Sequence, residues 1–210
     1  MKKLCLIIIS FFLFLNTSSA YTYSADPKQF IKEIIDDSIS KLSDKNLTED
    51  EKIKYIKNIA IENVDINALG LYTLGEIRKS TEKKRLIKYK KLFEKYFLKS
   101  LTSRLTDYSS KKFEVISAEK KSANYTIVKS KITGNSDQPE IQIDWRVYTK
   151  NPDKPLIRDL IVEGLSLART QKEEFSSILS SNNNDINILI SKLEEFISNW
   201  KILLKKYHFT

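Results

Sequence analysis

The sequence is poor in the residue types that carry metal, redox and nucleophilic chemistry. Its 210 residues include one cysteine, one histidine and one methionine, with only four glycines and four prolines. A single cysteine excludes a disulfide framework within the chain. There is no glycine-rich phosphate loop, and His208 stands near the end of the sequence, where chains usually fray and anchor a catalytic triad or a zinc ion poorly. We therefore predict that the protein is not an enzyme and binds no metal.

The first twenty residues have the three parts of a secretory signal peptide. Lys2 and Lys3 precede the apolar run Leu4–Leu15, and small residues follow up to Ala20. A membrane anchor, the alternative, needs about 20 apolar residues. We therefore predict a signal peptide that is cleaved after Ala20, and a single exported domain over residues 21–210.

Positive charge exceeds negative charge in this chain. It has 36 Lys and Arg against 27 Asp and Glu, a formal net charge of +9, and a mean hydropathy of -0.36. Removal of Lys2 and Lys3 leaves a net charge of +7, and Cys5 is removed with them. The lysines are scattered among acids and an exported protein rarely meets nucleic acid, so we predict no nucleic-acid partner. Two interpretations of the excess stay open: a solvated background, or weak attraction to an anionic membrane surface or an acidic partner, with Lys79–Lys99 as the densest run.

Helical and strand patterns occupy separate blocks of the sequence. Apolar residues spaced by three and four predict helices within 27–108 and 171–207, whereas alternation predicts four strands within 112–167. The clearest strand alternates polar residues with Ile141, Ile143, Trp145 and Val147. Separate blocks favour an α+β fold with an antiparallel four- to five-stranded sheet wrapped by helices, because a parallel sheet requires alternation of strand and helix.

Local signals predict where the helices begin and end. Asp26-Pro27 predicts the start of a first helix, and Thr48 and Glu51, spaced as a capping box, predict the start of a second. We expect a short helix over Ile66–Leu74 that ends at Gly75, a long helix from Ser80 to about Tyr108, and a later helix capped by Thr170. The long helix has one aromatic face and one basic face. We expect its aromatic face to cover the apolar face of the sheet.

Two blocks of the sequence resemble a known family. The segment Arg158–Leu167, which reads RDLIVEGLSL, is similar to the D-[apolar]-x-x-E-G-[apolar]-S-[apolar] block of MlaC proteins, also called toluene-tolerance or ABC-transporter auxiliary proteins. The segment Val64–Gly75, followed by Ser80-Thr81, resembles that family's short helix and the start of its long helix. The resemblance implies a sheet of the NTF2-like kind wrapped by helices, with acyl chains inserted between the layers.

The resemblance also implies a function. It points to a periplasmic carrier with phospholipid as cargo and no cofactor. Such a carrier shuttles lipid between an inner-membrane ABC transporter complex with an MCE-domain subunit and an outer-membrane lipoprotein–porin complex, and so maintains outer-membrane lipid asymmetry. We expect a monomer. Two other classes stay open: an exported binding module for another apolar ligand, and a protein-interaction domain with a dry core.

A lipid carrier needs a deep apolar slot, and we hypothesise one between the aromatic helix and the apolar strand face. A filled core requires the same stripes, so that interpretation stays open. The residues predicted to line the slot are Phe93, Tyr96, Phe97, Ile141, Ile143, Trp145, Val147, Leu160 and Val162, with Leu69 and Tyr72 near its mouth. For Asp159, Glu163, Gly164 and Ser166 we predict structural roles, in which Gly164 turns the chain and Ser166 bonds the backbone of that turn.

Overall fold

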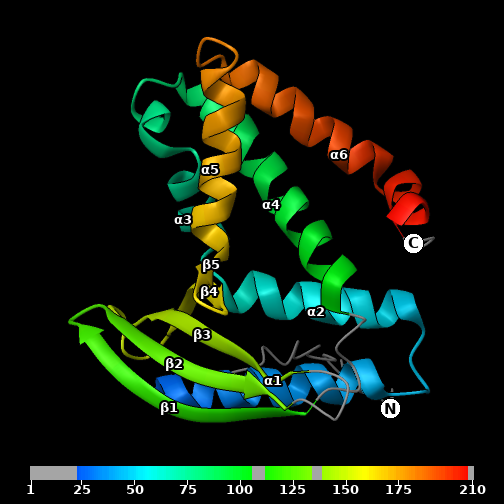
Figure 1. Cartoon of the computed structure of the whole chain (residues 1–210), viewed down its shortest axis with the longest axis vertical. Coiled ribbons are helices and arrows are strands. Elements are labelled where there is room, and N and C mark those ends of the chain that lie inside the picture. Colours follow the sequence, from blue (N-terminus) through cyan, green and yellow to red (C-terminus); the bar gives the residue numbers. More distant parts are fainter. Residues whose placement is uncertain (1–22, 106–111, 134–138, 208–210) are drawn as a thin grey trace, which may run out of the picture.

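The computed structural model describes residues 23–105, 112–133 and 139–207 of the chain, so the predicted signal peptide, Tyr108 and His208 lie outside it. The helices are α1 (Pro27–Ser43), α2 (Glu49–Asn63), α3 (Ile66–Thr73), the 3-10 helix η1 (Gly75–Lys79), α4 (Lys83–Leu105), α5 (Leu167–Ser180) and α6 (Ile186–Tyr207). The strands are β1 (Phe113–Ser122), β2 (Tyr125–Ile132), β3 (Ile141–Tyr148), β4 (Leu156–Val162) and β5 (Leu165–Ser166). The predicted α+β class is confirmed (Figure 1).

The five strands form one antiparallel meander in the order β1-β2-β3-β4-β5, and β5 adds only two residues. At the centre of the sheet, Trp145 of β3 pairs with Val128 of β2 on one side and with Leu160 of β4 on the other. The β3–β4 register shifts once, because Arg146 pairs with Asp159 whereas Val147 pairs with Ile157. The extra residue on β4 is Arg158, so it occupies a β-bulge, a place that re-aims a side chain.

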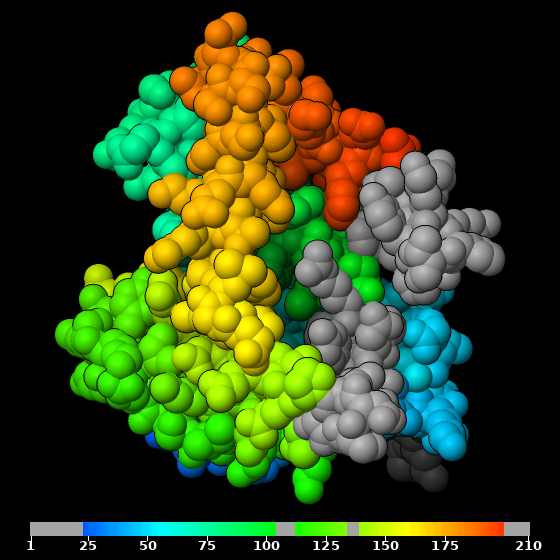
Figure 2. Space-filling model, viewed as in Figure 1, coloured from blue at the N-terminus to red at the C-terminus, as the bar shows by residue number. Residues whose placement is uncertain are grey.

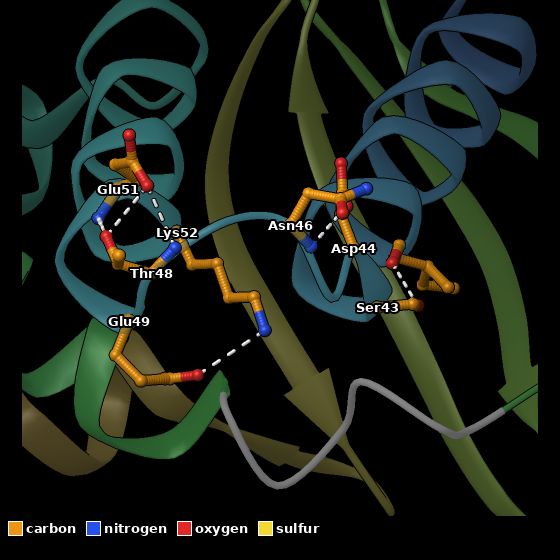
Figure 3. A network of polar contacts seen from close by, with 8 residues as sticks. Ser43, Asp44, Asn46, Thr48, Glu49, Glu51 and Lys52 are labelled. Atoms are coloured by element: carbon orange, nitrogen blue, oxygen red, sulfur yellow. Dashed lines mark hydrogen bonds and ion pairs between the residues drawn. The ribbon is translucent and has the colours of Figure 1, made fainter.

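The predicted starts of α1 and α2 agree with the structure. Asp26 caps α1 by accepting a hydrogen bond from the backbone N of Gln29 at 2.9 Å. At α2 the backbone N of Glu51 donates to Thr48 Oγ1 at 3.3 Å, and the backbone N of Thr48 donates to Glu51 Oε2 at 2.8 Å (Figure 3). This reciprocal pair satisfies donors that the first turn of a helix otherwise leaves free, which fixes the α1–α2 corner.

Two predicted helix starts are wrong by a few residues. The long helix α4 begins at Lys83 instead of Ser80, because the 3-10 helix η1 precedes it. Helix α5 begins at Leu167, and its cap is Ser166, whose Oγ accepts from the backbone N of Arg169 at 3.0 Å. Thr170 lies inside the first turn and donates its hydroxyl to the Ser166 carbonyl. The predicted end of the short helix holds, since Gly75 has a φ of 61°.

Most of the buried apolar residues form two cores. Figure 1 shows the elements that carry them: α1, α2 and the sheet in one half, and α3, α4, α5 and α6 in the other. The sheet core joins α1 and α2 to the sheet and consists of Phe30, Ile31, Ile34, Ile35, Ile59, Val128, Val147 and Ile157. The helical core is built mainly by α3, α4, α5 and α6 and includes Leu69, Tyr89, Phe93, Phe175, Leu179, Leu189 and Leu193.

The cover of the sheet differs from the prediction. Helix α1 packs on β1 and β2, whereas α4 packs mainly on α6, α3 and α2. Other helices cover the aromatic stripe of α4. The centroid of the Phe93 ring lies 6.3 Å from that of Phe175 in α5, and the centroid of the Tyr96 ring lies 4.8 Å from that of Phe196 in α6. Phe30 and Ile31 of α1, 2% and 0% exposed, take the place predicted for α4 on the sheet. A stripe of apolar residues predicts that one face of a helix is buried, but it does not predict which element packs against that face.

One polar cluster ties the sheet to the start of α3. Arg158, on the bulge of β4, donates from Nε and Nη2 to Asp65 Oδ2 at 2.9 and 2.6 Å and from Nη1 to the Tyr125 hydroxyl at 2.9 Å. Its guanidinium lies 3.4 Å from the centroid of the Tyr148 ring. Burial alone would lower the pKa of Arg158, but the bonds to Tyr125 and Asp65 outweigh it and raise that pKa. Because Asp65 also caps α3 through the backbone N of Ala68, the cluster orients the helical half against the sheet.

Candidate functional site

A cavity of about 260 Å³ lies between the two cores. Figure 2 shows the surface hollowed beside the first turns of α5, with α4 visible at the bottom of the hollow. The lining from the sheet half comprises Ile34, Ile35, Ile39, Leu42, Ile56, Ile59, Phe113, Trp145, Ile157 and Leu160. The lining from the helical half comprises Leu69, Phe93, Tyr96, Phe97, Leu101, Leu167 and Ala168. The cavity is therefore walled on both sides by aliphatic and aromatic groups.

Most of the polar side chains in the lining are hydrogen-bonded within the protein. Asn63 donates to the Ile59 carbonyl at 2.9 Å, and Thr73 donates to the Gly70 carbonyl at 3.0 Å. The Tyr96 hydroxyl donates to Gln171 Oε1 at 2.6 Å, which joins α4 to α5 at the cavity wall. A buried polar group whose hydrogen bonds are made does not favour water or a polar ligand, so the space is suited to hydrocarbon.

Trp145 is held in the floor of the cavity by its one polar atom. Its Nε1 donates to Ser130 Oγ at 2.8 Å, and that hydroxyl donates in turn to the Ile143 carbonyl at 3.2 Å. Ser130 is 2% exposed. With the indole N–H satisfied by Ser130, the remaining surface of Trp145 that borders the cavity is apolar.

The structure brings part of the predicted slot together. The predicted side chains that line the cavity are Leu69, Phe93, Tyr96, Phe97, Trp145 and Leu160. Those that do not line it are Tyr72, Ile141, Ile143, Val147 and Val162. Val147 is fully buried in the sheet core under α1, and Tyr72 is 42% exposed with Lys172 Nζ 5.3 Å from its ring. The predicted slot is shorter in the structure because α1, and not α4, covers the sheet. Helix α1 fills the sheet surface where we expected the slot to continue.

The α1 and α2 walls of the cavity are absent from the prediction. Ile35, Ile39 and Leu42 of α1 and Ile56 and Ile59 of α2 all line it. Their spacing marks an apolar face on each helix, and that signal is visible in the sequence. The sequence pattern does not show, however, that each face is wide enough both to pack on the sheet and to border a cavity.

The residues of the Asp-Glu-Gly-Ser block hold the link from β4 to α5. Asp159, 4% exposed, accepts from Ser166 Oγ at 2.6 Å and from the backbone N of Ala168 at 3.0 Å. Glu163 and Gly164 form the β4–β5 turn with φ values of 49° and 80°, a conformation that glycine adopts at no cost. The carboxylate of Glu163 also accepts from the backbone N of Gln142. The block thus sets where α5 begins and brings Leu167 and Ala168 to the cavity wall.

The described ranges contain no group of three or more His, Cys, Asp or Glu side chains placed to hold a metal ion. Within the same ranges, no helix has both the length and the apolar character needed to cross a membrane.

Comparison with known proteins agrees with this architecture. A solved structure of the phospholipid-binding protein from Ralstonia solanacearum, in complex with a phospholipid, superimposes with a TM-score of 0.66 and 16% sequence identity. The match covers 80% of this chain and 95% of that one. A search of curated proteins returns no match. The family model described as MlaC protein matches residues 32–195, and the chain belongs to this family.

Proposed function

We propose that this protein binds a phospholipid, with the acyl chains in the cavity between the two cores, and carries it through the periplasm. The observation that carries the proposal is the cavity itself: about 260 Å³, apolar on both walls, with most of its polar side chains already hydrogen-bonded. Membership of the MlaC family and the phospholipid in the similar Ralstonia solanacearum structure support the same cargo.

The binding of a phospholipid in this cavity requires no catalytic group, because the transfer of its acyl chains out of water supplies the free energy. Each methylene moved from water into an apolar wall contributes about 0.8 kcal/mol, so a dozen contribute roughly 10 kcal/mol. That is enough to hold a lipid in water, while the charged head group remains outside because the predominantly apolar lining includes no Lys or Arg side chain. The volume lies close to the lower end of ligand pockets, which span about 300–1,000 Å³. The protein is accordingly a binding protein rather than an enzyme.

The transport route is part of the same proposal. Export by the predicted signal peptide would place the chain between the two membranes. There it would exchange lipid with an inner-membrane ABC transporter complex and an outer-membrane lipoprotein–porin complex, and so support lipid asymmetry. Family membership is what supports this route.

The test is the lipid content of protein recovered after export and never exposed to detergent. Native mass spectrometry and lipid extraction should find phospholipid bound to the wild type. Ser100→Phe places a ring inside the cavity, where Ser100 lines the α4 wall, and should abolish retention in a folded protein. Ser176→Phe, the same change at an exposed site on α5, is the matched control and should retain lipid.

Each outcome of this test decides between the classes. A different apolar molecule in the extract would assign the cavity to another ligand. An empty wild type would count against every lipid role and favour an interaction domain with a dry core. Trp145→Asp, which puts a carboxylate in the cavity floor, should also lose lipid, and retention by a folded Trp145→Asp would refute the position of the acyl chains.

A further inference from the structure

The positive charge of the chain is concentrated on one helix. The run Lys79–Lys99 contains nine basic and two acidic residues, a net charge of +7, whereas the whole chain has a formal net charge of +9. The other two charges equal those of Lys2 and Lys3 in the predicted signal peptide. The rest of the exported chain is therefore neutral overall, which a uniform lysine-rich background does not explain.

Four of these lysines lie on one side of α4. At about 100° per residue, Lys83, Lys84, Lys91 and Lys95 fall within an arc of roughly 120° around Ile87. All four lysines are exposed, and Ile87 is 47% exposed. The opposite side of the helix carries Tyr89 and Phe93 into the helical core. We call the outward side, Lys83, Lys84, Ile87, Lys91 and Lys95, the basic face.

The positive charge of the basic face is not balanced by ion pairs within the described part of the chain. Neighbouring cations are paired: Lys88 lies 2.9 Å from Glu194, and Arg85 lies 3.4 Å from Glu82. No carboxylate among the described residues lies within 4.0 Å of the four lysines of the basic face, although Glu94 shares their arc. Lys91 and Lys95 stand at i and i+4, a spacing at which like charges destabilise a helix. An external anionic surface would relieve this repulsion.

The side chains on this face fit a bilayer better than a protein. Interfaces between proteins are depleted in lysine and enriched in arginine and aromatic residues at their centres. Lysine stems instead reach flexibly toward phosphate groups, and clusters of four to eight basic residues on an amphipathic helix are typical of binding to anionic lipid. Ile87, exposed in the middle of the cluster, can enter the head-group layer.

We propose that the basic face of α4 docks the protein on an anionic phospholipid membrane surface. The proposal does not depend on what the cavity holds. The docking helix also forms a wall of the cavity through Phe93, Tyr96 and Phe97, so the membrane surface and the cavity would be separated by about one helix diameter, 10–12 Å.

The test is co-sedimentation of the exported protein with vesicles. Vesicles of equal parts phosphatidylglycerol and phosphatidylcholine should bind the wild type, vesicles of phosphatidylcholine alone should not, and binding should vanish as salt rises to about 0.5 M. Each lysine near the surface contributes about fivefold to partitioning, so replacing four by glutamine should weaken binding by roughly 600-fold when the four contributions add. That variant carries Lys83→Gln, Lys84→Gln, Lys91→Gln and Lys95→Gln.

A matched variant separates this face from net charge. Lys120→Gln, Lys129→Gln, Lys150→Gln and Lys154→Gln remove the same charge from exposed sites on the sheet half and should leave binding within about threefold of wild type. Circular dichroism of both variants checks that they fold. Equal losses in the two variants, or no binding by the wild type, would overturn the proposal. Binding of polyglutamate but not of vesicles would assign the face to an acidic protein instead.

Discussion

The two cores are built from different materials, and the cavity lies where they meet. The helical core is a network of aromatic rings. The centroid of the Tyr89 ring lies 5.9 Å from that of Phe93, and the centroid of the Phe175 ring lies 6.5 Å from that of Tyr89 and 6.3 Å from that of Phe93. The sheet core is mainly aliphatic, with Ile31, Val128 and Val147 fully buried. Each core closes on itself, so the layer between them need not be filled for either half to be stable. In the proposed function, a lipid enters and leaves without dismantling a core.

The two cores are joined around Val64 and the start of α3. Val64 packs against both, and the backbone N of Asp65 donates to the Ile157 carbonyl of β4 at 2.9 Å. The Arg158 cluster and the bonds of Asp159 to the start of α5 complete this joint. Substitutions inside one core, at the joint and at the cavity wall should then have clearly different effects.

The largest losses are expected inside the cores. Phe30→Ala in the sheet core and Phe175→Ala in the helical core each remove a ring that is 2% or 3% exposed. We expect each to lower the free energy of unfolding by about 3–5 kcal/mol, because the lost transfer energy is added to that of the cavity left behind. Urea denaturation followed by circular dichroism measures both. A loss below about 1 kcal/mol in one half would mean that this half contributes little to the cooperative fold.

A smaller loss is expected at the joint. Arg158→Ala removes the bonds to Asp65 and Tyr125 and leaves Asp65, whose side chain is 18% exposed, without its cation. We expect the free energy of unfolding to fall by about 2 kcal/mol. Arg169→Ala is the matched control: this side chain lies exposed in the first turn of α5, so its loss should change stability by less than about 0.5 kcal/mol. Similar values for the two variants would argue against a structural joint at Arg158.

Local patterns predicted most of the fold because they are set within a few residues. The caps at Asp26 and Thr48, the turn at Gly75 and the alternation of β3 all depend on neighbours in sequence. The resemblance carried by the Asp159–Ser166 block supplied the family, and the family match agrees with it.

The arrangement of apolar faces could not be predicted in the same way. The stripes of α1 and α4 are equally suited to cover a sheet, and the choice depends on long-range packing such as the contact of Tyr96 with Phe196. Likewise, Trp145 and Val147 share a strand face in the sequence pattern, yet Trp145 borders the cavity and Val147 lies beneath α1. Whether a stripe meets another stripe or an empty space is a property of the whole fold.

A still smaller effect is expected in the β4–β5 turn. Gly164 has a φ of 80°, and a Cβ added there would have no heavy atom within 4 Å. Gly164→Ala should therefore cost only backbone strain, about 1 kcal/mol of unfolding free energy, with the cavity unchanged. Thermal unfolding and lipid content measure the two effects separately. Loss of lipid without loss of stability would mean that the turn acts on the cavity through α5.

The smallest effect on stability, and the sharpest test of the space between the cores, is expected at Gly70 of α3. A Cβ there would lie 2.8 Å from Phe93 Cδ1, so the Phe93 ring must shift, and the cavity that Phe93 lines offers it room. The gain in helix propensity, about 1 kcal/mol, should offset this shift, leaving Gly70→Ala within about 0.5 kcal/mol of wild type but with less bound lipid. Asn67→Ala, on the exposed side of the same helix, gains propensity without touching Phe93 and should keep its lipid. A cost above about 2 kcal/mol in Gly70→Ala would mean that Phe93 has nowhere to move, because a ring held on all sides belongs to a filled core and not to a cavity wall.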